Sequence, residues 1–319
     1  VGGNKFLKDW GFETVIFSLL IGLFISNIFS IPKWLKEALS SELFVKIGLV
    51  LLGTTVLFDD LLKAGALGLI QSCVVVFTVW NFCFWLCRKM KIDKEMSLML
   101  SSAVSICGVS AAVATAGAIK GDKTKLSYVV SLVLVVAVPM ILIMPGLAKL
   151  MGLPEDMAGA WIGGTIDTTG AVAATGAIYG EVALQTSTIV KFSQNVLLGV
   201  AAFLISIYWS YSKKEVTEEK PTLKVIWLRF PKFVLGFVAA SLVFSFCVAP
   251  EVVSDAKPIL KNIQGMWFAL AFMSIGLETD FKSLITSENR RSTYAFLGAQ
   301  AFNVVFTLLV AWILFGLIA

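Results

Sequence analysis

Residues 157–180 read MAGAWIGGTIDTTGAVAATGAIYG, and residues 96–121 read MSLMLSSAVSICGVSAAVATAGAIKG. Each segment is long enough to span a bilayer, which takes about 20 residues, but each is rich in Gly, Ala, Ser and Thr and has a polar interruption near its middle. Their last ten residues, 112–121 and 171–180, are identical at seven positions and share the ending GAI-x-G. This similarity predicts an internal duplication with two related segments in one fold.

The chain as a whole is too apolar for a water-soluble protein. Hydrophobic residues make up 58% of the 319 residues, charged residues only 15%, and the mean hydropathy is +0.87. A soluble domain carries about 25% charged residues, so this chain lacks the polar surface to cover itself in water. Apolar runs of spanning length lie at 11–29, 42–62, 64–87, 125–150, 185–209, 225–248, 258–277 and 293–318. With the two interrupted segments they predict an all-α polytopic membrane protein of about ten membrane segments, folded as a single domain over residues 1–319.

Short charged stretches between the spans set the orientation. The Lys and Arg residues gather at 88–94, 210–224 and 282–291. Cytoplasmic loops carry an excess of these residues, so we expect all three loops, including a charged linker at 211–223, in the cytoplasm. Residues 250–257 should face outward. The net charge of +5 is explained in this way without nucleic-acid binding.

The two polar interruptions are candidates for a binding site. Non-helical backbone at membrane depth is tolerated only where it is buried in protein or lines a water-filled cavity. The first break is expected at residues 105–110 (SICGVS) and the second at 163–170 (GGTIDTTG). Each segment is either a broken spanning helix or a re-entrant hairpin. A half-helix that begins after each break would direct unpaired N–H groups and about half a positive charge at the midplane, which favours an anion. The alternative is that the small residues only allow close helix packing.

Two ionisable residues lie in apolar surroundings, where a charge is costly and requires a reason. Asp167 falls within the second break, and it could carry a proton, bind a cation or cap the following helix. Lys191 lies inside span 185–209, and it could face an anion, pair with Asp167 or extend to the membrane interface. The residues expected to bind the anion are Ser105, Cys107, Gly108, Ser110, Thr165, Thr168, Thr169, Lys191 and Asn195, with Asp167 for the coupling ion.

Signatures of catalysis and of metal binding are missing. The sequence has no histidine, which removes the commonest transition-metal ligand and the usual general base. The motifs G-x-S-x-G, H-E-x-x-H and the phosphate-binding loop are absent, and the five cysteines have no metal-binding spacing. We therefore expect no enzymatic activity, no cofactor and no metal.

The run SSAVSICGVSAAVATAGAIKG at 101–121, the run IGGTIDTTGAVAATGA at 162–177 and the following Lys191 resemble the YeiH (UPF0324) family. These are bacterial inner-membrane proteins often called sulfate exporters. The resemblance extends over nearly the whole chain, including SIGLETDFKSL at 274–284. It implies a multi-pass protein of the bacterial inner (plasma) membrane that transports small anions through a fold with discontinuous helices.

Together these features predict a secondary active transporter of small anions, sulfate-like or organic, with its site between the two breaks. The expected partners are the anion, H⁺ or Na⁺ as the coupling ion and the lipid bilayer, and a homodimer is an open alternative to a monomer. Two other functions stay open. One is a cation/proton antiporter that uses Asp167, and the other is an anion channel or a membrane subunit that transports nothing.

Overall fold

The computed structural model describes residues 14–29, 40–213, 227, 228, 230–278 and 290–318, and every regular element in this part of the chain is a helix. The α-helices are α2 (Thr14–Ile28), α4 (Ser41–Gly53), α5 (Phe58–Lys89), α6 (Lys94–Ser102), α7 (Val109–Ile119), α8 (Lys123–Leu150), α9 (Glu155–Thr165), α10 (Thr169–Tyr179), α11 (Glu181–Lys213), α13 (Phe233–Leu242), α14 (Pro250–Glu278) and α16 (Arg290–Ala311). Three π-helical segments are η1 (Ala103–Cys107), η2 (Val243–Cys247) and η3 (Trp312–Ile318).

Four helices in the described part of the chain are long and apolar enough to cross a membrane. They are Leu61–Lys89, Lys123–Leu150, Glu181–Trp209 and Arg290–Leu317. Shorter apolar helices lie at Phe17–Ser26, Val109–Ile119 and Phe233–Cys247. The prediction of an all-helical membrane protein is confirmed at this level. Most of the charged linker at 211–223 and most of the loop at 282–291 lie outside the described residues.

The span expected at 42–62 is divided, so that prediction was wrong in its bounds. α4 ends at Gly53, and α5 begins at Phe58. The Thr54 hydroxyl donates to the Leu51 carbonyl oxygen at 2.7 Å, which satisfies one of the carbonyls left unpaired at a helix end. α5 then runs continuously through the region where one span was expected to end and the next to begin.

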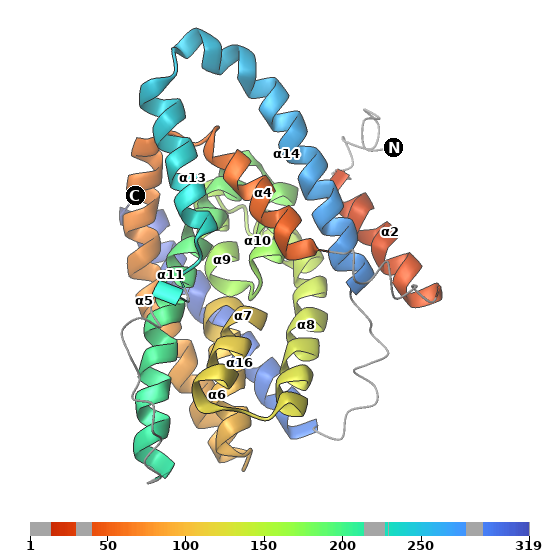
Figure 1. Cartoon of the computed structure of the whole chain (residues 1–319), viewed down its shortest axis with the longest axis vertical. Helices are drawn as coiled ribbons and strands as arrows, with labels where there is room; N and C mark the ends of the chain where they lie inside the picture. The colour runs from red at the N-terminus through yellow and green to blue at the C-terminus, as the bar shows by residue number, and fades with distance from the viewer. Residues whose placement is uncertain (1–13, 30–39, 214–226, 229, 279–289, 319) are drawn as a thin grey trace.

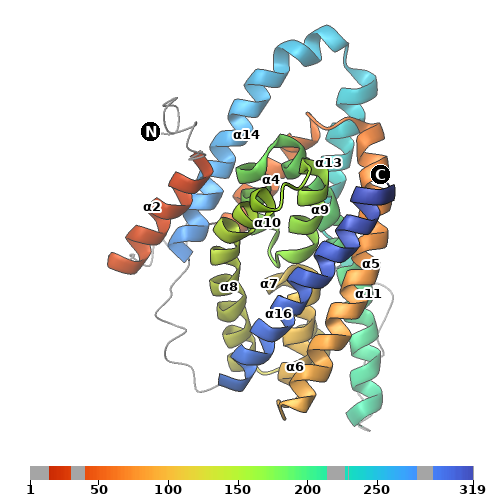
Figure 2. The same ribbon diagram turned by 180° about the vertical axis from the view of Figure 1, so that it is seen from behind.

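Two helical hairpins point toward each other in the middle of the molecule (Figure 1). The hairpin of α6, η1 and α7 occupies the lower half of that view, and the hairpin of α9 and α10 occupies the upper half. α11 packs against members of both hairpins, and α16 crosses behind them, as Figure 2 shows from the other side. α14 packs against α2 and α4. The centre of the molecule is thus formed by the two segments whose sequences are similar.

A glutamate closes each hairpin at its base. Glu155, in the first turn of α9, accepts hydrogen bonds from the N–H groups of Val182 and Ala183 in α11, at 2.9 and 3.3 Å. Glu95, in the first turn of α6, accepts one from the N–H of Asp122, the N-cap of α8. Val182 follows Glu155 by 27 residues, and Asp122 follows Glu95 by 27 residues. The two hairpins are therefore closed by the same residue type at the same separation.

α9 lies directly against α11 because two of its glycines face that helix. A Cβ on Gly159 would lie 2.7 Å from the carbonyl oxygen of Ala183, and a Cβ on Gly163 would lie 2.5 Å from that of Ser187. Ala183, Ser187 and Lys191 follow one another at four-residue spacing, so they lie on one face of α11. The close contact along this face brings Lys191 to the end of α9.

Candidate functional site

The first hairpin is interrupted at Gly108, between η1 and α7. Gly108 has φ +60° and ψ −115°, a conformation that residues with a Cβ rarely adopt. Just before it, the Ser105 hydroxyl donates to the Ser101 carbonyl oxygen at 2.7 Å. A serine that bonds back in this way offers the backbone an alternative to regular helix. The hydroxyl of Ser105 is thereby used within its own segment.

The second hairpin is interrupted between Thr165 and Thr169. Ile166 is extended with ψ 133°, and Thr168 is the N-cap of α10. The Thr168 hydroxyl oxygen accepts a hydrogen bond from the N–H of Ala171 at 3.3 Å. The sequence also permits Asp167 as this cap, but the structure has Thr168, the next residue, as the N-cap, so the Asp167 carboxylate does not cap α10.

The two interruptions touch each other. A Cβ on Gly108 would lie 3.2 Å from the Cβ of Asp167 and 3.2 Å from the Cγ2 of Thr168. Gly108 is the N-cap of α7 and Thr168 that of α10, so the N-termini of two helices meet at one point. The first N–H groups of each helix lack an intrahelical partner and carry partial positive charge. Gly108, Asp167 and Thr168, three of the expected site residues, therefore lie together.

Lys191 contacts both interruptions. Its ammonium donates to the carbonyl oxygens of Ile106 and Ile166 at 2.7 and 2.8 Å, and to Gln194 Oε1 at 2.9 Å. These contacts use all three N–H groups of the ammonium. The two carbonyls lie where η1 and α9 end, and helix C-termini carry partial negative charge. With only 1% of its surface exposed, Lys191 does not extend to the membrane interface, so that alternative was wrong.

Side-chain amides satisfy further carbonyls at the helix ends. Gln300 and Asn303 of α16 donate to the Thr165 carbonyl oxygen at 3.0 and 3.1 Å, and Asn303 also donates to that of Val104 at 3.2 Å. Neither Gln300 nor Asn303 belongs to the site predicted from the sequence. The available signal was two amide side chains one turn apart within an apolar span, which is typical of hydrogen bonding between membrane helices.

Asp167 is buried without a partner. Its exposed fraction is 2%, and neither carboxylate oxygen has a hydrogen-bond partner among the described residues. Thr165 Oγ1 and Asn195 Oδ1 share this property, although the Asn195 amide donates to the Thr169 hydroxyl at 3.1 Å. Burying a lone ionised carboxylate costs several kcal/mol, about what stabilises a small domain. The arrangement therefore calls for a proton, a cation or water at Asp167.

Two further expected site residues flank Gly108 in the first interruption. Ser110 is exposed, in the first turn of α7. Cys107 is a free, buried thiol that packs in an apolar cluster with Ala111 and Leu198.

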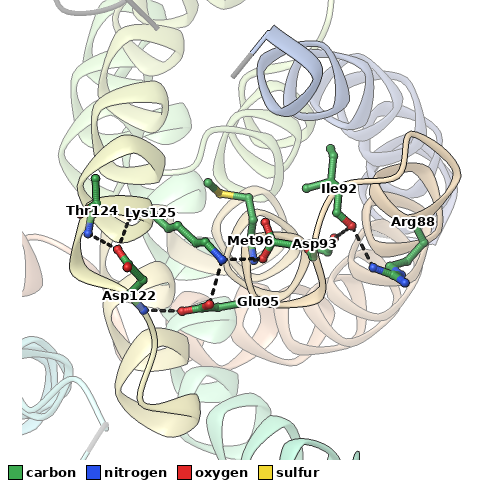
Figure 3. Close-up of polar contacts among 9 residues, drawn as sticks. Arg88, Ile92, Asp93, Glu95, Met96, Asp122, Thr124 and Lys125 are labelled. Atoms are coloured by element: carbon green, nitrogen blue, oxygen red, sulfur yellow. Dashed lines mark hydrogen bonds and ion pairs between the residues drawn. The ribbon is translucent and has the colours of Figure 1, made fainter. Parts of the chain in front are cut away.

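An ion-pair cluster holds the base of the first hairpin (Figure 3). Lys125 of α8 donates to Asp93 at 2.8 Å and to Glu95 at 2.9 Å. Burial raises the pKa of Asp93, but hydrogen bonds from Lys125 and from the Met96 N–H outweigh it, so the pKa lies below its ordinary value. The cluster fastens the start of α6 to the start of α8.

Comparison with known proteins places the chain in a family. The family model described as Conserved hypothetical protein 698 matches residues 4–295. A UPF0324 membrane protein of Rhodopirellula baltica is 39% identical over 100% of this chain and 60% of its own length, and one of Nitratidesulfovibrio vulgaris is 38% identical over 100% and 57%. The chain thus spans about 60% of the length of these relatives. No solved structure matches. The chain belongs to the Conserved hypothetical protein 698 family, whose relatives carry the name UPF0324 membrane proteins.

Proposed function

We propose that this protein is a secondary active transporter of small anions in the bacterial inner membrane, with Asp167 carrying the coupling ion. The observation that supports this most is the buried carboxylate of Asp167 between two interrupted helices, which has no hydrogen-bond partner among the residues that the structure describes. A carboxylate in that position binds and releases a cation or a proton as its access to water changes. A purely structural residue at this place would have a partner.

The arrangement of the hairpins supports transport by alternating access. Transporters commonly place substrate and coupling ion where half-helices from two inverted repeats meet near the midplane. Here the two similar segments point at each other, and each is closed by a glutamate 27 residues from its partner. We infer that they are inverted repeats and that the meeting point of Gly108 and Asp167 is the transport site.

The N-termini of α7 and α10 are the proposed anion-binding groups. The N–H groups of Thr169 and Gly170 have no intrahelical partner, and the hydroxyls of Thr165 and Thr168 can donate as well. Lys191 stays a predicted site residue, but its contacts support a role in neutralising the helix C-termini. An anion would reach its ammonium only by displacing a carbonyl oxygen.

Reconstituted vesicles test the proposal. Protein in liposomes with an imposed inward proton gradient should accumulate a labelled anion, with uptake that saturates and stops when the gradient is dissipated. Asp167→Asn should abolish the accumulation, whereas Asp255→Asn, which removes an exposed carboxylate on α14, should retain it. Anion flux that ignores every ion gradient would indicate a channel, and absence of flux would favour a membrane subunit that transports nothing.

A cation/proton antiporter is the second candidate, and one observation favours it. Among the described residues, the buried side-chain atoms without partners around the centre are all oxygens, and they lie on Asp167, Thr165, Asn195 and Gln300. Oxygens are the ligands that Na⁺ and other hard cations prefer. The same vesicles, loaded with a pH-sensitive dye, distinguish the two functions. Proton efflux in response to added Na⁺, with no dependence on the anion present, would support the antiporter and contradict anion transport.

A further inference from the structure

We propose that the site takes a monovalent anion together with one proton on Asp167, and that it rejects divalent anions. This inference rests on the proposed function and specifies its substrate class. It follows from the charges that the structure places around the two interruptions.

The helix C-termini at the centre are already neutralised. Two helical segments end at Ile106 and Ile166, and two C-termini together amount to about one negative charge. The ammonium of Lys191 lies within 2.8 Å of both carbonyl oxygens and supplies one positive charge. Because its three N–H groups are occupied, this charge is already matched within the protein.

The helix N-termini present the opposite case. Those of α7 and α10 meet at Gly108 and Thr168, and together they amount to about one positive charge. Asp167 lies at the same point, and neither of its carboxylate oxygens has a hydrogen-bond partner in the described part of the chain. When Asp167 is ionised, its negative charge balances the two N-termini, and an added anion would be repelled. When Asp167 is protonated, about one positive charge is left for a ligand.

This balance sets both the stoichiometry and the charge of the ligand. One proton neutralises the Asp167 carboxylate. One monovalent anion then binds at the helix N–H groups and supplies the negative charge that the carboxylate no longer carries. A divalent anion would leave about one negative charge unmatched in a buried site, which is strongly unfavourable. Anion and proton therefore bind together, and the combined movement of both carries no net charge.

Thermal-shift titrations of the purified protein test the inference, because a ligand that binds only the folded state raises its unfolding temperature. The monovalent probes are nitrate, formate and bromide, and the divalent probes are sulfate and oxalate. Bulky gluconate keeps the ionic strength constant. The titrations compare wild type, Asp167→Asn and the control Asp255→Asn from about pH 5 to about pH 8. Elution of each variant as a single species from a size-exclusion column, without a probe anion, checks that the variant is folded.

For wild type and Asp255→Asn we expect at least one monovalent probe to bind. Its affinity should fall about tenfold per pH unit above the range in which Asp167 holds its proton. Asp167→Asn should bind the same probe with an affinity that does not change with pH, because the amide is neutral throughout. Sulfate and oxalate should bind at least about a hundredfold more weakly than the best monovalent probe, the equivalent of about 2.7 kcal/mol.

Several results would overturn the inference. The first is that sulfate or oxalate binds as tightly as every monovalent probe. The second is that Asp167→Asn no longer binds anions. The third is that the affinity of the wild type does not depend on pH. If uptake in vesicles is driven by protons while sulfate binds tightly, only this inference fails. If monovalent binding follows the expected pH dependence but vesicles show no gradient-driven uptake, the proposed transport function fails and the binding site stands.

Discussion

Gly108 and Asp167 occupy matching positions in the two similar segments, and they lie against each other where the hairpins meet. The alignment that pairs residues 112–121 with 171–180 also pairs these two. A Cβ on Gly108 would lie 3.2 Å from the Cβ of Asp167, which is tighter than ordinary contact. Both positions cannot carry side chains here without a shift. The glycine thus leaves space for the aspartate at the one place where both N-termini converge.

Replacing Gly108 by alanine should destabilise the protein. The positive φ alone costs about 1–3 kcal/mol for a residue with a Cβ, and the new methyl group would also meet Val133 Cγ1 at 2.7 Å. Thermal unfolding in detergent should show a clearly lower midpoint. Gly265→Ala is the control, because nothing lies within 4 Å of its Cβ position in α14. That change should be neutral or slightly stabilising, since alanine is the better helix former. Equal midpoints for both variants would contradict the close contact at Gly108.

Removing the ammonium of Lys191 should destabilise the centre in proportion to the donors lost. Lys191→Met leaves two carbonyl oxygens and Gln194 Oε1 without this partner, at about 1–3 kcal/mol for each buried group. Lys191→Gln retains an amide donor and should fall between methionine and wild type in unfolding temperature. Lys261→Met breaks an exposed pair with Glu181, which is worth about 1 kcal/mol or less, and serves as control. A Lys191→Met protein as stable as the control would refute the role in neutralising helix ends.

The glutamate at the base of the second hairpin should act as a cap for α11. Glu155→Ala removes the acceptor for the N–H groups of Val182 and Ala183, and loss of such a cap costs about 0.5–2 kcal/mol. Glu155→Gln keeps an acceptor oxygen and should cost less. Hydrogen exchange at the N–H groups of Val182 and Ala183 measures the effect directly. In Glu155→Ala, the protection of these two groups should fall more than that of the rest of α11. Glu251→Ala, an exposed glutamate in α14, should leave that protection unchanged.

The ion pair of Asp93 and Lys125 should make stability depend on pH at the acid end. The pKa of Asp93 is lowered in the folded state, so its contribution is complete above the unfolded pKa of about 3.9 and is lost as pH falls through the folded value. Because the Asp93 side chain is 51% exposed, we expect at most about 1 kcal/mol. Unfolding midpoints of wild type and Asp93→Asn should therefore differ at neutral pH and converge in acid. A difference that widens below about pH 4 would show the opposite sign of linkage.

Orientation in the membrane is tested by cysteine labelling in intact cells. In a variant without the native cysteines, Lys91→Cys should be protected from a membrane-impermeant thiol reagent, because its basic loop is expected in the cytoplasm. Ser254→Cys should react from outside. Both side chains are exposed in the structure, so burial within the protein does not explain a lack of reaction. Labelling at Lys91→Cys with none at Ser254→Cys would reverse the orientation.

Sequence alone indicated the membrane surroundings, two segments of similar sequence and the two buried charges. Apolar runs of spanning length left only a bilayer as surroundings, and two similar stretches with polar residues near their middles identified the segments that form the centre. Asp167 and Lys191 stood out because a charge in an apolar run requires compensation. These conclusions depend on composition and local pattern, which a single chain displays directly.

Only the tertiary structure decided which groups compensate which. Lys191 donates to carbonyls 85 and 25 residues away, and Gln300 and Asn303 reach Thr165 from 135 residues or more along the chain. Such partners depend on how helices pack, as where Gly159 and Gly163 bring α9 against α11. The spacing of residues within one helix contains no information on these contacts. Packing therefore engages the three donors of Lys191, and it leaves the Asp167 carboxylate without a hydrogen-bond partner in the described part of the chain.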